Sequence, residues 1–307
     1  MRIHAFSPTK LGVCAILLVP VFGCAANAEE YLKSYPVSGT PSVRVNADNG
    51  GVHITTSDTN KVEFDVKYEQ SDWGTDGGPK ISSRQQGNTV ELSAFVGDQG
   101  WWFHSGTRRL SIEVRMPKNA DLHVETSNGG VDVSSVNGSV VVHTSNGGIR
   151  GEQLTGTIEV NSSNGGLTLE GLKGNVKAGT TNGAIRASGL DCRCGFSTTN
   201  GSVSVAGRFD SLDISSGNGA VVARADSGSR MSSAWNIQTT NAAVNLSLPA
   251  DIKANVNAGT TNGRIVVDLP HESRGDSSRT EVHTALNGGG PDLSVRTTNG
   301  SIHLSGI

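Results

Sequence analysis

Residues 124–131 read Val-Glu-Thr-Ser-Asn-Gly-Gly-Val, and close copies follow at 142–149 (Val-His-Thr-Ser-Asn-Gly-Gly-Ile) and 160–167 (Val-Asn-Ser-Ser-Asn-Gly-Gly-Leu). The Asn-Gly pair returns at one constant spacing through six units, with Thr or Ser two positions before each Asn. A fixed period with alternating apolar residues is typical of short strands stacked coil on coil. We therefore predict an all-β fold, a parallel β-solenoid with coils of about 18 residues marked by Asn-Gly corners.

Aligned coils give aliphatic columns, which the alternation of a strand places on one interior side. Examples are the column Val140, Ile158, Val176, Cys194, Leu212 and the column Val136, Leu154, Leu172, Leu190. The apolar-x-apolar-x-Thr-x-Asn row puts the asparagines on the same side. We expect them to form an interior structural ladder that satisfies the turn backbone. Its members are Asn128, Asn146, Asn164, Asn182, Asn200 and Asn218.

A meander of hairpins is the alternative, because Asn-Gly is also a preferred hairpin turn. Hairpins would not need Asn at the same phase of every repeat, whereas stacked coils do, so the solenoid is favoured. Right-handed winding is the expected default for parallel crossovers, although the repeat itself does not fix the hand.

The chain divides into three predicted regions. Residues 1–28 read as a secretory signal peptide, with an apolar stretch followed by small residues and cleavage after Ala28. The alternative is a lipoprotein signal ending before a lipidated Cys24, because Gly23-Cys24 resembles the end of a lipobox. Residues 29–125 are expected to form an N-terminal β region with enlarged coils and inserted loops. Residues 126–307 are expected to form regular repeats with a loop insertion at 270–292.

Charge and cysteine content narrow the function classes. The net charge of −3 and the dispersed cations give no basic field, so nucleic acid is not an expected partner. Either signal reading predicts export to the periplasm, the outer membrane if lipidated, or the extracellular surface. Cys192 and Cys194 could be a redox pair or half of a metal site. The column alignment favours Cys194 as a buried apolar residue.

The repeated apolar-x-apolar-x-Thr-x-Asn-Gly units, the signal and two strands that end in Pro, at Pro117 and Pro249, resemble the bacterial putative-adhesin family of β-strand repeat proteins. That group is a domain of unknown function. The resemblance covers about residues 40–307. It implies an envelope setting and brings no catalytic motif.

The most conspicuous candidate for ligand contact is the aromatic run Trp101-Trp102-Phe103, which would either stack on a sugar or surface or fold back as a cover. Arg274-Gly275-Asp276 is interpreted as a solvated loop. His123 and His143 lie close in the aligned coils without a third ligand column, so no metal site is expected. Neutral Asn in the turns disfavours calcium, and no cofactor is expected.

These patterns favour a non-enzymatic, adhesin-like envelope protein that meets a polysaccharide, an envelope protein or a host surface. One alternative is a scaffold that self-associates end to end, since Ile307 lies within a repeat and no C-terminal cap is visible. A second alternative is a carbohydrate-active enzyme of the parallel β-helix type. The outward charges show no repeated acidic pair suited to glycoside hydrolysis.

Overall fold

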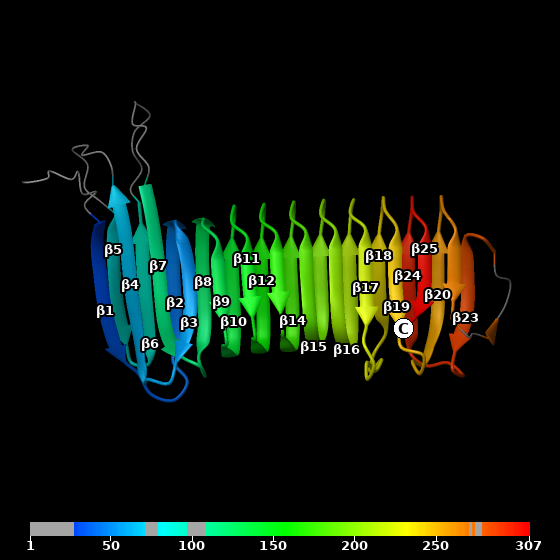
Figure 1. Ribbon diagram of the computed structural model, residues 1–307, viewed down its shortest axis with the longest axis horizontal. Coiled ribbons are helices and arrows are strands. Elements are labelled where there is room, and N and C mark those ends of the chain that lie inside the picture. The colour runs from blue at the N-terminus through cyan, green and yellow to red at the C-terminus, as the bar shows by residue number, and fades with distance from the viewer. Residues whose placement is uncertain (1–27, 71–78, 97–107, 270–271, 274–277) are drawn as a thin grey trace, which may run out of the picture.

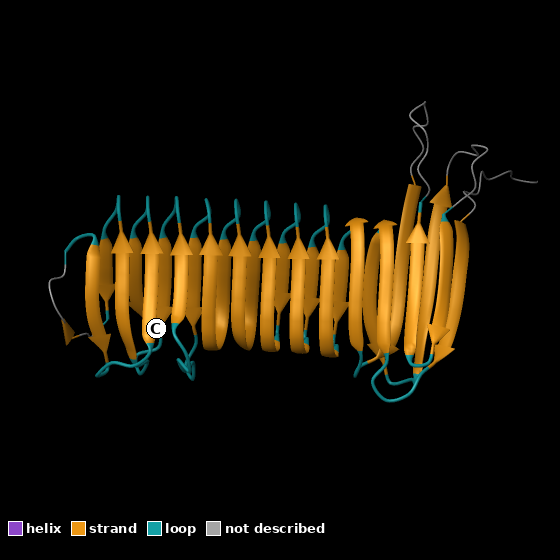
Figure 2. Ribbon diagram, turned by 180° about the vertical axis from the view of Figure 1, so that it is seen from behind, coloured by secondary structure: helices purple, strands orange, loops and turns teal. Residues whose placement is uncertain are grey.

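The fold is described by a computed structural model for residues 28–70, 79–96, 108–269, 272–273 and 278–307. Every regular element within these ranges is a strand, and all 25 strands belong to one sheet that is wound into an elongated, solenoid-like stack (Figures 1 and 2). None of the described residues forms a helix that could cross a membrane.

The strands fall into three groups along the chain. The first group is β1 (Ala28–Pro36), β2 (Ser42–Asn49), β3 (Gly51–Ser57), β4 (Lys61–Gln70), β5 (Lys80–Gln86), β6 (Thr89–Phe95) and β7 (Arg108–Pro117). The second is β8 (Asp121–Asn128), β9 (Val131–Ser134), β10 (Asn137–Thr144), β11 (Ile149–Glu152), β12 (Thr155–Ser162), β13 (Leu167–Glu170), β14 (Lys173–Thr180), β15 (Ile185–Thr198), β16 (Val203–Ser216) and β17 (Val221–Ala225). The third is β18 (Trp235–Thr239), β19 (Val244–Leu248), β20 (Ala254–Thr260), β21 (Ile265–Asp268), β22 (Glu272–Ser273), β23 (Glu281–Leu286), β24 (Asp292–Thr297) and β25 (Ile302–Gly306).

The second group forms the regular stack. Strands that run into the Asn-Gly corners make one side, which we call the incoming face: β8, β10, β12, β14 and the later halves of β15 and β16. Strands that leave the corners make the opposite side, the outgoing face. Pairing is parallel and advances by one repeat from coil to coil, so that Val140 pairs with both Leu122 and Ile158. The predicted all-β, solenoid-like repeat is confirmed, and the hairpin meander is wrong for this part of the chain.

The interior is built from small, mostly β-branched side chains, which suit a pleated, half-buried surface. Val140 and Val142 are fully buried, and Ile158 is 1% exposed. The next coil repeats the pattern directly above, so each aliphatic row is covered by its neighbour. Complete burial of such a side chain stabilises the fold by roughly 1.5–3 kcal/mol. The chain therefore needs no large aromatic core.

Five of the six Asn-Gly corners, from Asn146 to Asn218, are held by the buried Ser or Thr two residues before the Asn, whereas Thr126 Oγ1 at the first corner is buried without a hydrogen-bond partner. Ser162 Oγ donates to the Gly147 carbonyl of the preceding corner at 2.8 Å and accepts from the Gly165 N–H at 2.8 Å. The same pair of bonds recurs at Thr144, Thr180, Thr198 and Ser216. The hydroxyl thus provides a hydrogen-bond partner for one buried carbonyl and one buried N–H group of the turns.

The asparagine ladder exists, but its expected place in the interior is wrong. Each amide donates to the amide oxygen of the previous coil at 2.7–2.9 Å, and all six side chains are exposed. The six are Asn128, Asn146, Asn164, Asn182, Asn200 and Asn218. In most coils the incoming strand ends at the Ser or Thr before them, as β10 ends at Thr144. The alternation of a strand therefore no longer holds at the Asn, which turns outward.

The N-terminal region differs from the enlarged coils expected for residues 29–125. Strands β6 and β7 do form a parallel coil, but it lies outside β2 and β3, which are sandwiched between that coil and β8–β9. Beyond it β5 pairs antiparallel with β6, β4 with β7, and β1 with β4. These antiparallel strands close the end of the stack, and the Tyr31 and Tyr35 hydroxyls both contact Ser83 Oγ, at 2.7 and 2.5 Å.

The C-terminal region is likewise not the simple continuation that was expected for 126–307. Residues 226–234 lengthen one coil, and β24 and β25 lie between the coil of β18–β19 and the coil of β20–β21. Strand β23 then pairs antiparallel with β20. Within the insertion expected at 270–292, the described residues thus supply a C-terminal cap, which is not visible in the sequence pattern.

Candidate functional site

An open groove with a volume of about 1050 Å³ runs along the incoming face beside the corners. One wall is a column of exposed hydroxyls one residue before each of the first five corner asparagines: Ser127, Ser145, Ser163, Thr181 and Thr199. Their positions are equivalent in successive coils, so hydroxyl groups repeat along the stack at the strand spacing of about 4.8 Å. We call this feature the hydroxyl groove.

The floor of the hydroxyl groove is the outward column two positions earlier. It passes through Asn161, Gly179, Ser197 and Ser215, which pair in register from coil to coil. Gly and Ser are poor choices for an exposed strand position, where β-branched and aromatic residues are favoured. Small side chains at this column leave the hollow open.

An aromatic side chain stands at the N-terminal end of the groove. Phe95 is 46% exposed, lines the hollow, and ends β6 immediately beyond Ala94, which pairs with Ala47. Asp48 fixes this position because its carboxylate accepts the Val96 N–H at 2.9 and 3.0 Å. An aromatic ring beside a row of hydroxyls offers an apolar face next to hydrogen-bonding groups.

A second hollow, of about 740 Å³, continues the groove toward the C-terminal end and shares Thr198, Thr199 and Ser215 with the first. Its lining is again rich in threonine: Thr239, Thr240, Thr260, Thr261, Thr280, Thr297 and Thr298. The two hollows together follow most of the length of the stack. A long open groove of this form suits an extended ligand better than a small, compact ligand.

Charge is concentrated at the two ends of the groove. Glu125 is the single carboxylate among the described residues that line the first hollow, and Glu281 with Arg296 lies in the second. The lining from Asn161 to Ser215 is uncharged. Elsewhere, on β4, a hydrogen bond from Lys67 to Asp65 raises the pKa of the exposed Lys67 ammonium. Lys67 does not line the groove.

The two histidines that the repeat brings together are neighbours in the structure. The rings of His123 and His143 have centroids 6.3 Å apart, and His123 Nε2 lies 3.0 Å from Glu125 Oε1. Among the described residues, no three His, Cys, Asp or Glu side chains come together as a metal site. Of the two, His143 lines the N-terminal end of the groove.

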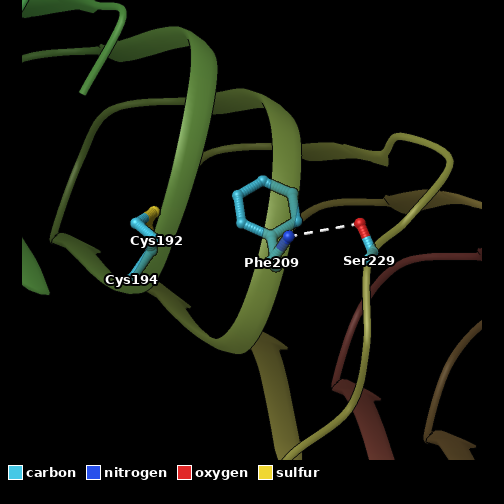
Figure 3. The surroundings of a disulfide bond; sticks show 4 residues. All are labelled: Cys192, Cys194, Phe209 and Ser229. Atoms are coloured by element: carbon cyan, nitrogen blue, oxygen red, sulfur yellow. Dashed lines mark hydrogen bonds between the residues drawn. A yellow bond between two sulfur atoms is a disulfide. The ribbon is translucent and has the colours of Figure 1, made fainter. Parts of the chain in front are cut away.

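The two cysteines form a disulfide inside the stack (Figure 3). Cys194 is buried at 4% exposure in the predicted aliphatic column, so its core position is confirmed, but it is not a free thiol. Cys192 also faces inward. It pairs with Gly174 of the preceding coil and with Phe209 of the next coil. The two cysteine Cα atoms are 5.5 Å apart, and the pairing of β15 with β16 shifts register beside them, between Cys192 and Arg193. The same pocket of core is closed by Ser229, whose Oγ accepts the Phe209 N–H at 3.2 Å (Figure 3).

Several sites proposed from the sequence lie outside the described residues. These are Trp101, Trp102 and Phe103, the Arg274-Gly275-Asp276 tripeptide, Cys24, and the signal segment up to residue 27. The hydroxyl groove and Phe95 were not among the sequence-based candidates. The sequence does contain a signal for the groove, because Ser or Thr stands one residue before the Asn in most coils. The candidate residues were instead taken from the inward-facing columns and from the inserted loops.

Comparison with known proteins gives a family and few further details. The model of the family described as Toastrack DUF4097 matches residues 42–305. No curated protein matches the sequence. Similar solved structures are a putative adhesin from Bacteroides fragilis, a putative cell adhesion protein from Clostridium sporogenes and a putative adhesin from Parabacteroides merdae.

These structures are distant. Their identities to this chain are 13%, 11% and 9%, with TM-scores of 0.40, 0.24 and 0.27. The alignments cover 93%, 92% and 91% of this chain, and 100%, 100% and 96% of the respective structures. Similarity at this level carries no argument about function.

The family match is of a different kind, because it extends from the start of β2 into β25 and so includes the regular stack, the groove and the intercalated coils at both ends. It confirms the resemblance to a repeat family of unknown function. The chain belongs to the Toastrack DUF4097 family.

Proposed function

We propose that this protein is an exported, adhesin-like and non-enzymatic binding protein whose hydroxyl groove holds an extended, uncharged, hydroxyl-rich polymer such as a polysaccharide. The observation that carries the proposal is the unbroken hydroxyl column from Ser127 to Thr199, beside a floor that is uncharged from Asn161 onward and is built of Gly and Ser from Gly179 to Ser215. Export is supported by the signal-like residues 1–28.

The chemistry of the groove matches such a ligand. A hydroxyl group both donates and accepts hydrogen bonds, so a row of them can pair with sugar hydroxyls directly or through water. The uncharged middle of the groove provides no selective force for a polyanion or a polycation. Phe95 adds an apolar face on which a sugar ring can stack.

Repetition explains why a weak contact would be sufficient. Each coil presents nearly the same hydroxyl group, and a polymer that spans several coils makes several such contacts at once. Linked contacts of this kind raise the overall affinity without any single strong site.

The proposal is tested with a variant whose larger side chains fill the groove. Ser197→Leu with Ser215→Leu places bulky apolar groups on its floor, while Thr168→Leu with Ser204→Leu places the same groups on exposed positions of the outgoing face. Each protein is assayed on an array of envelope and plant polysaccharides. We expect binding by the parent protein and by the outgoing-face control, and loss of binding in the groove variant.

Two further variants separate the aromatic contributions. Phe95→Ala tests the groove end, and Trp101→Ala with Trp102→Ala tests the aromatic run. If the groove variant binds as well as its control, the groove is not the binding site, and a loss confined to the Trp101/Trp102 variant would assign binding to the aromatic run. New reducing ends released from a bound polysaccharide would show that the protein is an enzyme.

A further inference from the structure

The last coil of the described chain does not lie at an end of the stack. Strand β24 lies between β18 and β20, and β25 lies between β19 and β21 (Figure 1). Val295 pairs with Ile237 on one side and with Ala258 on the other. We call residues 292–307 the inserted coil, and the space that it fills between its two neighbours the slot.

The slot holds the inserted coil by contacts that any coil of this protein can make. Asn299 donates to Asn241 Oδ1 at 2.7 Å, and Asn262 donates to Asn299 Oδ1 at 2.8 Å, which continues the exposed amide ladder. Thr297 Oγ1 donates to the Ala242 carbonyl at 2.8 Å, as in the regular corners. The apolar residues of the inserted coil are fully buried: Leu293, Val295, Ile302 and Leu304.

Without the inserted coil, the slot would have two open sides. Strands β18 and β19 would each lose one partner, and so would β20 and β21. Unpaired strand edges of this kind are templates for pairing with another chain. The slot therefore strongly favours being filled by a coil with this sequence.

The covalent connection of the inserted coil is unlike that of the regular coils. A regular coil continues directly into its neighbours in the stack on both sides. The inserted coil instead follows β23 through residues 287–291, and neither of its neighbours in the stack is adjacent to it in the chain. Asn287, Gly288 and Gly289 have φ angles of 51°, 84° and 87°, which marks this connection as a sharp turn.

Residues 287–291 are exposed or half-buried, so hydrogen bonds rather than apolar burial hold the turn; two of them are backbone bonds, from Gly289 N–H to the Leu286 carbonyl and from Asn255 N–H to the Pro291 carbonyl. Asn287 Nδ2 donates to the carbonyls of Ala250 and Ile252 at 2.8 Å, and Asn255 Nδ2 donates to the Gly290 carbonyl at 2.5 Å. If the turn opens into a more extended form, the same coil can reach a slot that is not its own. Exchange of an identical element keeps all contacts of the slot and changes only the connection, which makes it a low-cost route to an oligomer.

We propose that the inserted coil is an exchangeable element, and that the partner it recognises is a second copy of this chain, whose slot it fills. Copies joined in this way are linked through their C-terminal halves and keep their hydroxyl grooves. This mode of association differs from end-to-end stacking, because antiparallel strands cover both ends of the stack.

A pair of serines provides the test. Ser247 on β19 and Ser305 on β25 are in register across the slot boundary, with their Oγ atoms 3.0 Å apart. In a Cys24→Ser background, one protein carries Ser247→Cys and a second carries Ser305→Cys. The two are unfolded, mixed, refolded together at high concentration and oxidised. A disulfide between them can form when the inserted coil of one copy fills the slot of the other.

The control uses two regular coils that are joined directly in the chain. Ser204 on β16 and Val222 on β17 are also in register on the outgoing face, so Ser204→Cys and Val222→Cys proteins are mixed in the same way. We expect a covalent heterodimer of twice the chain mass from the Ser247/Ser305 mixture and none above background from the Ser204/Val222 mixture.

The double variant Ser247→Cys with Ser305→Cys in one chain completes the test. Its internal disulfide in the monomer shows that the two cysteines fold and meet as the serines do. The proposal is overturned if this internal bond forms fully while the mixed single variants give no more heterodimer than the control mixture. Equal heterodimer from both mixtures would also overturn it, because the cross-linking would then be non-specific.

Discussion

The Thr180 hydroxyl donates a hydrogen bond to the carbonyl oxygen of Gly165, 2.8 Å away in the preceding corner. The oxygen of the same hydroxyl accepts the N–H of Gly183 at 3.2 Å. Thr180 is only 7% exposed, so water does not replace these bonds readily. One side chain thus joins two coils and satisfies its own turn.

Replacing Thr180 by Val keeps the shape and removes both bonds. We expect the free energy of unfolding to fall by about 1–3 kcal/mol, because two backbone groups lose a buried partner. Thr181→Val, on the exposed neighbour, should change it by less than about 0.5 kcal/mol. Thr180→Ser should stay close to the parent protein, since Ser162 fills the same place one coil earlier. Urea unfolding compares them, and equal losses for Thr180→Val and Thr181→Val would contradict the prediction.

The two glycines that follow Asn164 should respond very differently to Ala. A Cβ on Gly165 would overlap the carbonyl group of Gly147 in the neighbouring coil, whereas a Cβ on Gly166 would lie 3.3 Å from the nearest atom, the Ala184 carbonyl oxygen. Ala184 itself occupies the position equivalent to Gly166 one coil later.

We therefore expect Gly165→Ala to destabilise the protein by about 3 kcal/mol or more, as severe overpacking does. Gly166→Ala should cost less than about 1 kcal/mol. Thermal and urea unfolding of the two variants measure the difference. The steric account of the corner fails if Gly165→Ala unfolds at the same urea concentration as Gly166→Ala.

The sequence predicts the regular stack well because its period carries the register directly. Val140 and Ile158 are one repeat apart and pair as expected. The motif does not say which coil lies next to which, because every coil presents nearly the same Thr and Asn-Gly edge. The placement of β2–β3 beside β8–β9, and of β24–β25 between two earlier coils, therefore could not be predicted.

Two other features were hidden for different reasons. Apolar and polar residues alternate in a strand whether its neighbour is parallel or antiparallel, so the sequences of β4 and β7 did not reveal that these two strands pair antiparallel. Strict alternation would place Asn164 on the same side as Ser162, two residues earlier. Strand β12 ends at Ser162, however, and the sequence pattern does not show where the strand ends. The hydroxyl groove could have been found from the Ser163 and Thr181 column.

The exposed amide ladder gives a pH-dependent prediction. Asn164 donates to Asn146 Oδ1 and accepts from Asn182 Nδ2, both at 2.7 Å. Asn164→Ala removes both bonds and should cost about 1 kcal/mol, a modest value because water can replace part of them. Asn164→Asp keeps the acceptor but, when ionised, places a carboxylate against the Asn146 amide oxygen.

Protonation restores a donor to the introduced carboxyl group, so its pKa in the folded protein should rise above the value of about 3.9 in the unfolded chain. The deficit of Asn164→Asp against the parent protein should therefore be small below about pH 4 and grow as the pH rises through the raised pKa. Ser163→Asp is the control for added charge at the corner. Urea midpoints at several pH values measure the deficit, and a pH-independent deficit would argue against the ladder.

The Cys192–Cys194 disulfide should contribute little to stability, although it lies in the core. It closes a loop with one intervening residue, for which the chain-entropy contribution is about 1–2 kcal/mol, well below that of a long loop. Val176 and Leu212 flank Cys194 in its column, so Cys192→Ala with Cys194→Val fits the aliphatic packing. We expect this double variant to lose no more than about 2 kcal/mol in urea unfolding and to be unaffected by reductant. Cys192→Ala with Cys194→Ser should lose more, because it buries a hydroxyl group in an apolar column. Complete unfolding of the parent protein by reductant alone would instead show that the disulfide is essential, and that stacked burial does not suffice to hold this coil.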